Sequence, residues 1–180
     1  FNKKGFNGAS LDEIAEYLHV SKGAFYYHIR NKEDLLYNCY NHSLAIVERV
    51  YREAERAGST GIEKSDYASR RTFLIQNSDL GPLIRYNTIT ALPTARRLEV
   101  LARTDAANNH FLDFLAQGVA DGSIRPVDPL VARNLLAGAI NASMDISLWR
   151  RVDNIDDAAR DYFDVFFNGL LPREPKPATD

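Results

Sequence analysis

Apolar side chains in this 180-residue chain recur at spacings of three and four residues and almost nowhere at alternate positions. The first spacing is typical of amphipathic α-helices and the second of half-buried strands. We therefore predict an all-α fold. The expected helices, which are separated by Gly, Pro, Ser and Asn, cover residues 10–18, 21–29, 31–57, 63–78, 82–91, 94–121, 129–150 and 155–170.

Short polar residues mark the starts of the first three predicted helices. Ser10 is followed by Glu13 at the spacing of a capping box, and Ser21 and Asn31 are good N-cap residues. Only two residues separate the first two helices. Two short helices joined by so tight a turn form a helix-turn-helix, which is common in DNA-binding proteins but also occurs in unrelated helical domains. From spacing alone, both DNA binding and a purely structural role remain open.

Charge and cysteine content narrow the class of protein. Lys and Arg number 22 against 24 Asp and Glu, a formal net charge of −2, so no overall positive field attracts nucleic acid or an anionic membrane. Residues 1–32 hold five basic and three acidic residues, a local charge of +2, so we expect any DNA contact at this end. The single cysteine, Cys39, excludes an internal disulfide and a Cys-cluster metal site and favours the cytoplasm. No apolar run approaches the ~20 residues that span a bilayer, and we expect no membrane partner.

Residues 4–36, KGFNGASLDEIAEYLHVSKGAFYYHIRNKEDLL, closely resemble the N-terminal DNA-binding domain of the tetracycline-repressor (TetR/AcrR) family of bacterial transcriptional regulators. The segments in register are Gly5-Phe6, Ile14-Ala15, Val20-Ser21-Lys22-Gly23, Tyr26-Tyr27-His28 and Asn31-Lys32-Glu33. His19 stands where the family usually has Gly, at a turn position that needs a positive φ. The resemblance also implies that most of the family's first helix is missing before Phe1.

The resemblance implies that the second short helix reads double-stranded operator DNA. Residues in its first turn would meet base edges in the major groove, and the following aromatic and imidazole groups would hold phosphates. The ammonium of Lys32 and the free N–H groups of its helix would grip one more phosphate. The candidate DNA-binding residues are Ser10, Leu11, Ser21, Lys22, Gly23, Ala24, Tyr26, Tyr27, His28 and Lys32.

The predicted helix over residues 94–121 carries polar residues in the middle of an apolar stripe, which runs Leu98, Leu101, Asp105, Asn108, Leu112, Leu115 and Val119. If that stripe is buried, Asp105 and Asn108 either hydrogen-bond to another helix or line a cavity. A contact between helices is the commoner arrangement. The alternative is a pocket for a small-molecule effector of unknown class, whose candidate residues are Tyr67, Tyr86, Ile89, Asp105, Asn108, Phe111 and Met144.

The last two predicted helices have faces suited to a second copy of the chain. One carries small residues at the centre of its stripe, and the other carries more aromatic surface than its own domain can bury. We predict a homodimer through a four-helix interface, as in proteins that resemble this one. The candidate interface residues are Leu135, Gly138, Ala142, Trp149, Tyr162, Phe163 and Phe166.

The expected organisation is a DNA-binding domain over residues 1–34, a joining helix over 32–57, a ligand-binding and dimerisation domain over 58–171, and a flexible tail over 172–180. The four histidines have no metal-ligand spacing, and no phosphate loop or nucleophile elbow is present, so we expect no catalytic site, metal or cofactor. The resemblance implies a ligand-responsive transcriptional regulator and favours a repressor that an effector releases from a palindromic operator. The alternative is a helical small-molecule-binding or scaffolding protein without DNA binding.

Overall fold

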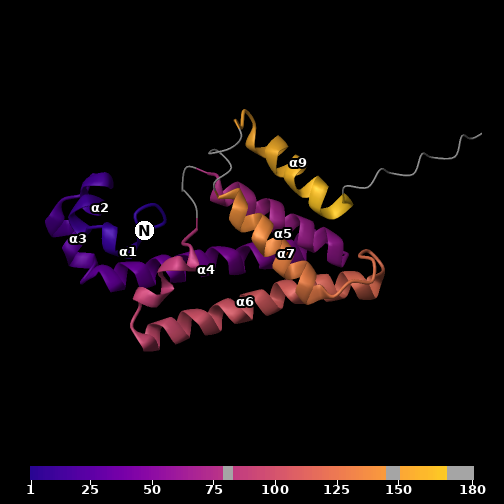
Figure 1. Ribbon diagram of the computed structural model, residues 1–180, viewed down its shortest axis with the longest axis horizontal. Helices are drawn as coiled ribbons and strands as arrows, with labels where there is room; N and C mark the ends of the chain where they lie inside the picture. The colour runs from indigo at the N-terminus through magenta and orange to yellow at the C-terminus, as the bar shows by residue number, and fades with distance from the viewer. Residues whose placement is uncertain (79–82, 145–150, 170–180) are drawn as a thin grey trace, which may run out of the picture.

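The computed structural model describes residues 1–78, 83–144 and 151–169 (Figure 1). This part of the chain contains no strand, so the predicted all-α fold is confirmed. Its helices are α1 (Gly5–Gly8), α2 (Leu11–Tyr17), α3 (Lys22–His28), α4 (Lys32–Ala57), α5 (Gly61–Gln76), the 3-10 helix η1 (Tyr86–Ala91), α6 (Thr94–Asp121), α7 (Pro129–Ser143) and α9 (Ile155–Asn168).

The long helix α4 joins two groups of helices (Figure 1). The short helices α1, α2 and α3 gather at its N-terminal end. Further along, α4 packs against α5 and α6, while α7 contacts both α5 and α6, and α9 lies against α5. Because α4 is unbroken from Lys32 to Ala57, it connects the N-terminal helices rigidly to the larger bundle.

Two clusters of buried apolar side chains hold the helices together, and α4 contributes to both. The first lies in the bundle and includes Val50, Ala54, Phe73, Phe111, Phe114, Leu136 and Phe163. The second lies near the N-terminal half of α4 and consists of Leu36, Tyr40, Leu44, Leu92 and Val100, with Phe1 and Phe6 packed against it. A change in how α6 packs on α4 therefore reaches the cluster on which α1 rests.

The N-terminus of α5 crosses α6 at unusually close range. A Cβ atom on Gly61 would lie 2.1 Å from the backbone nitrogen of Gly118, where no real side chain fits. The Gly61 N–H donates to Asp121 Oδ2 (2.8 Å) and the Ile62 N–H to Ser123 Oγ (3.2 Å). Two glycines facing each other thus allow backbone contact, and two hydrogen bonds fix its position.

The structure differs from the predicted helices in two places. Of the predicted helix over 82–91 the structure describes residues 83–91, and among these only the 3-10 helix η1 forms, because β-branched Thr88, Ile89 and Thr90 disfavour an α-helix. The hydroxyl of Thr88 instead lies 3.0 Å from the hydroxyl of Tyr40. The short helix α1 was not predicted. The start of the predicted helix over 82–91, the end of the one over 129–150 and the predicted tail lie outside the described residues.

Candidate functional site

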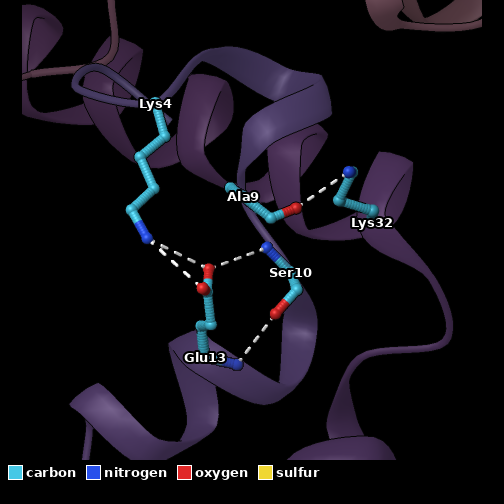
Figure 2. A network of polar contacts seen from close by, with 5 residues as sticks. All are labelled: Lys4, Ala9, Ser10, Glu13 and Lys32. Carbon is cyan, nitrogen blue, oxygen red and sulfur yellow. Dashed lines mark hydrogen bonds and ion pairs between the residues drawn. The ribbon is translucent and has the colours of Figure 1, made fainter.

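Side-chain caps set the positions of α2 and α3. Ser10 Oγ accepts a hydrogen bond from the Glu13 N–H (3.0 Å), and the Glu13 carboxylate accepts one from the Ser10 N–H (3.4 Å), which confirms the predicted capping box (Figure 2). Ser21 Oγ accepts from the Ala24 N–H (3.2 Å) and begins α3. Between the two helices His19 has a φ of 55°, the left-handed conformation predicted for this turn.

One side chain of α3 is buried and the others point outward. Phe25 packs inward, whereas the side chain of Tyr27 is 85% exposed. The Tyr27 and His28 rings meet edge to face, with centroids 5.0 Å apart. The exposed residues of α3 and its cap are Ser21, Lys22, Gly23, Ala24, Tyr26, Tyr27 and His28. This face can approach a DNA groove without moving any side chain of the core.

An acidic residue that the sequence pattern did not reveal lies beside this face. Asp12 of α2 accepts hydrogen bonds from Lys22 Nζ (2.6 Å) and from the Tyr26 hydroxyl (3.0 Å). The contact with Lys22 holds the pKa of Asp12 below its ordinary value, and the same contact raises the pKa of Lys22. The lysine predicted to read a base is therefore paired with a carboxylate of the preceding helix.

Lys32 begins α4, but its ammonium group faces the protein. Lys32 Nζ donates to the Ala9 carbonyl (2.8 Å) and lies 4.6 Å from the centroid of the Phe6 ring. Figure 2 shows the hydrogen bond from Lys32 to Ala9 together with the contact between Lys4 and the Glu13 carboxylate. Lys32 therefore ties the start of α4 to the segment before α2. Of the two predicted DNA-binding residues at the start of α2, Ser10 is exposed and Leu11 is half-buried.

The buried face of α6 only partly agrees with the predicted stripe: Leu115 is buried as predicted, but the N-terminal half of that stripe is exposed. Asp105 is exposed, so the expectation that it lies on the buried stripe is wrong, and Leu98 is 59% exposed. The buried stripe is offset by about one residue, because apolar residues occupy two neighbouring faces of this helix and spacing alone does not choose between them. The buried residues are Val100, Ala107, Phe111, Phe114, Leu115 and Gly118.

A cavity of about 360 Å³ lies among α4, α5, α6 and α7. Its lining includes three predicted ligand-binding residues, Tyr86, Asn108 and Met144. The structure does not bring the other four to it. Phe111 is buried in the bundle core, Ile89 packs on the second cluster, Tyr67 lines a separate surface hollow, and Asp105 lies outside the cavity.

The polar groups of the cavity come mainly from residues that were not predicted. The described lining residues carry no charged side chain. Thr72 Oγ1 donates to the Ala68 carbonyl (2.8 Å), and the hydroxyls of Tyr86 and Thr104 lie 2.7 Å apart. Gln76, which is 4% exposed, has a side-chain oxygen without a hydrogen-bond partner. The signal was present in the sequence, because Thr72 and Gln76 fall on the apolar stripe of α5.

Two arginines of α6 attach the cavity wall to α4. Arg96 forms an ion pair with Asp34 in the first turn of α4. Arg103 donates to Asn41 Oδ1 (2.8 Å) and to Glu48 Oε1 (2.7 Å). Because α4 leads directly to α3, these contacts link the lining of the cavity to the position of the helix-turn-helix.

The exposed apolar face of the bundle lies mainly on α7. Leu135 is 65% exposed, and the predicted Gly138 and Ala142 are exposed on the same helix. On α9, Val165 is 49% exposed, and the predicted Phe166 is half-buried. This face is available to a second copy of the chain.

Two predicted interface residues of α9 pack inward instead. Phe163 is fully buried against Phe73, so the prediction that it belongs to an exposed aromatic surface is wrong: it fills the bundle core. The hydroxyl of Tyr162 donates to the Ala139 carbonyl (2.8 Å), which holds α9 against α7. The predicted interface residue Trp149 lies outside the described residues.

Two other kinds of site are absent from the described residues. No group of His, Cys, Asp and Glu there is arranged to hold a metal ion. Each helix in this part of the chain is too short or too polar to cross a membrane.

Two family models match the sequence. Residues 1–38 match "Bacterial regulatory proteins, tetR family", and residues 72–170 match "Tetracyclin repressor-like, C-terminal domain". Among curated proteins, the chain is 25% identical over 140 residues to the transposon Tn10 TetC protein of Escherichia coli, covering 77% of this chain and 69% of that protein. It is 34% identical over 53 residues to IcaR of Staphylococcus epidermidis, an HTH-type negative transcriptional regulator of a biofilm operon, covering 27% of this chain and 29% of IcaR.

Solved structures show the same fold. The TetR family transcriptional regulator PfmR from Thermus thermophilus superposes with a TM-score of 0.71 at 22% identity, covering 96% of this chain and 94% of PfmR. AibR in complex with isovaleryl coenzyme A and operator DNA superposes with a TM-score of 0.72 at 24% identity, covering 90% of this chain and 88% of AibR.

Proposed function

The chain belongs to the tetracycline-repressor family of bacterial regulatory proteins, and on that premise we propose that it is a repressor that leaves its operator when a small molecule enters the cavity among α4–α7. Regulators of this family bind operator DNA, respond to small-molecule effectors and form homodimers. The single observation that carries the proposal is the outward face of α3, which two side-chain caps and the left-handed His19 hold clear of the core.

DNA is recognised by α3 in this proposal. Ser21, Lys22 and Ala24 at its start meet base edges, as the first turn of a recognition helix does. Tyr26, Tyr27 and His28 hold phosphates, and Ser10 and Leu11 lie near the DNA backbone at the start of α2. Gly23 lies on the same exposed face of α3. Lys32 exchanges its bond to the Ala9 carbonyl for a phosphate when DNA binds. Lys22 exchanges its bond to Asp12 for a bond to a base when DNA binds, so the carboxylate keeps the lysine in place until then and repels phosphates that come too close.

Ligand and DNA are coupled through α4 and α6. An occupant of the cavity contacts Thr104 and Asn108 on α6, the helix whose Arg96 and Arg103 hold α4. A ligand that prefers a different packing of α6 on α4 shifts the population toward that packing. In a dimer formed through the exposed faces of α7 and α9, such a shift changes the distance between the two α3 helices and lowers operator affinity.

The remaining assignments follow the same proposal. Residues 1–34 form the DNA-binding domain, 58–171 form the sensor and dimerisation domain, and the helix over 32–57 joins them. The protein acts in the cytoplasm, where its operator lies, and has no enzymatic activity. Membership of a family of transcriptional regulators supports both statements.

The test compares two lysine variants of the full chain in fluorescence-anisotropy titrations on a duplex selected by the wild type. Lys22→Ala should weaken binding about tenfold or more and reduce discrimination between the selected duplex and a random one. Lys64→Ala removes the same charge from α5, where Lys64 contacts Gln117, and should leave binding unchanged. Equal effects of the two substitutions, or no salt-dependent binding by the wild type, would favour a helical scaffolding protein instead.

A further inference from the structure

We propose that the cavity among α4–α7 binds an uncharged, mainly apolar molecule that carries a hydroxyl or amide hydrogen-bond donor, and that Gln76 receives this donor. This inference rests on the proposed function, since it names the chemical class of the effector.

The volume of the cavity limits the size of the molecule. The cavity measures about 360 Å³, near the lower end of the range for ligand sites. At ~30 Å³ per water molecule in the liquid, this corresponds to about a dozen waters. A molecule with a similar number of non-hydrogen atoms fills it.

The lining determines the charge of the molecule. Its described residues are aliphatic, aromatic, hydroxyl or amide side chains, and none of them is ionised. Burial raises the pKa of Tyr51, so this phenol stays neutral as well. A carboxylate or ammonium ion entering the cavity would lose its hydration without gaining an opposite charge from the described lining residues, which is strongly unfavourable. An uncharged molecule does not meet this cost.

Gln76 provides the specific polar contact. Its side chain is 4% exposed and lines the cavity, and its Oε1 accepts no hydrogen bond. Buried acceptors are nearly always paired in folded proteins, because an unpaired one loses its bonds to water without replacement. A donor in the cavity restores the missing bond. A ligand hydroxyl suits this position well, since it can also accept a bond from the amide N–H groups of Gln76.

Three hydroxyl groups of the lining, those of Thr72, Tyr86 and Thr104, are already paired. The hydroxyl of Thr72, one turn before Gln76 on α5, donates to Ala68 of its own helix. The hydroxyls of Tyr86 and Thr104 lie within hydrogen-bond distance of each other. Unlike these hydroxyls, the side-chain oxygen of Gln76 has no partner, so it is free to accept a hydrogen bond from a donor on the ligand.

Three matched probes test the proposal on the full chain by isothermal titration calorimetry: 2-naphthol, naphthalene and 2-naphthoate. The wild type should bind 2-naphthol about tenfold more tightly than naphthalene, which lacks the donor, and should bind the anionic 2-naphthoate most weakly. Gln76→Leu should remove the preference for 2-naphthol and leave naphthalene binding intact. Thr72→Val, which changes a paired hydroxyl in the same cavity, should keep the preference.

The proposal is overturned if 2-naphthoate binds as tightly as 2-naphthol, if Gln76→Leu keeps the preference, or if none of the probes binds. Operator affinity of each variant without a probe is measured in parallel. Intact operator binding together with any of these outcomes contradicts only the ligand class. If the wild type itself does not bind an operator, the proposed function is contradicted.

Discussion

Replacing Gly61 by Ala tests the close crossing of α5 and α6, two of the helices that line the cavity. The added methyl group would lie 2.1 Å from the nitrogen and 2.3 Å from the Cα of Gly118, and 2.4 Å from the Phe114 carbonyl oxygen. All three atoms belong to the backbone of α6, so no side-chain rotation relieves the clash. The two helices must move apart, which also stretches the hydrogen bond from the Gly61 N–H to Asp121.

The expected cost follows from the nature of the contact. Overpacking a close-packed core typically costs ~1–3 kcal/mol, and a contact with backbone lies at the upper end, about 3 kcal/mol. In a protein of this size each kcal/mol lowers Tm by ~2–4 °C. We therefore expect Gly61→Ala to lower Tm by about 6–12 °C in thermal denaturation followed by circular dichroism at fixed protein concentration.

A second glycine substitution serves as the control. Gly23 lies within α3, and a Cβ atom on it would meet nothing within 4 Å. Gly23→Ala should leave Tm unchanged or raise it, because alanine favours the helix. If Gly61→Ala unfolds at the wild-type temperature, or if both substitutions lower Tm equally, the close crossing of α5 and α6 is refuted.

Three further predictions concern DNA binding, assembly and pH. Asp12→Asn releases Lys22 and should strengthen binding to duplexes of any sequence and steepen the log-log salt dependence by up to about one; unchanged anisotropy titrations would contradict this role. Leu135→Glu places a charge on the exposed face of α7 and should give a monomer by analytical ultracentrifugation, whereas a monomeric wild type at micromolar concentration would contradict the proposed dimer face. Hydrogen bonds from Ser123 and the Gly61 N–H lower the pKa of Asp121 in the folded protein. The ionised carboxylate therefore stabilises the fold above its ordinary pKa of 3.8, and this stabilisation is lost as the pH falls. Asp121→Asn should accordingly make Tm depend less on pH at the acid end of a plot of Tm against pH.

Features that depend on neighbouring residues could be predicted from the sequence. The capping box at Ser10 and the cap at Ser21 each involve groups only a few residues apart, whereas the left-handed turn at His19 was predicted from the resemblance to the family. The geometry of the two caps therefore needs no knowledge of the rest of the fold. The same holds for the start of α4 at Asn31, whose side chain accepts a hydrogen bond from the Asp34 N–H. The exposed face of α3 follows from these local choices.

Features that depend on packing between helices could not be predicted. Asp105 and Val100 lie on neighbouring faces of α6, and only the partners in the bundle decide which face is buried. The sequence pattern predicted Phe163 on the exposed aromatic surface, but its side chain packs against Phe73 in the core. The bond between Asp12 and Lys22 crosses a turn and joins two exposed side chains, so no apolar pattern indicates it.

Selection of random-sequence duplexes by the wild-type protein, followed by salt titration of the best binder, tests the central claim most directly. We predict enrichment of an inverted repeat whose half-sites lie about one helical turn or more apart, because two α3 helices related by a two-fold axis reach successive major grooves. Its affinity should fall linearly with salt on a log-log scale, with a slope of about 0.9 per neutralised phosphate. Recovery of no preferred sequence, together with binding that does not respond to salt, would contradict the account.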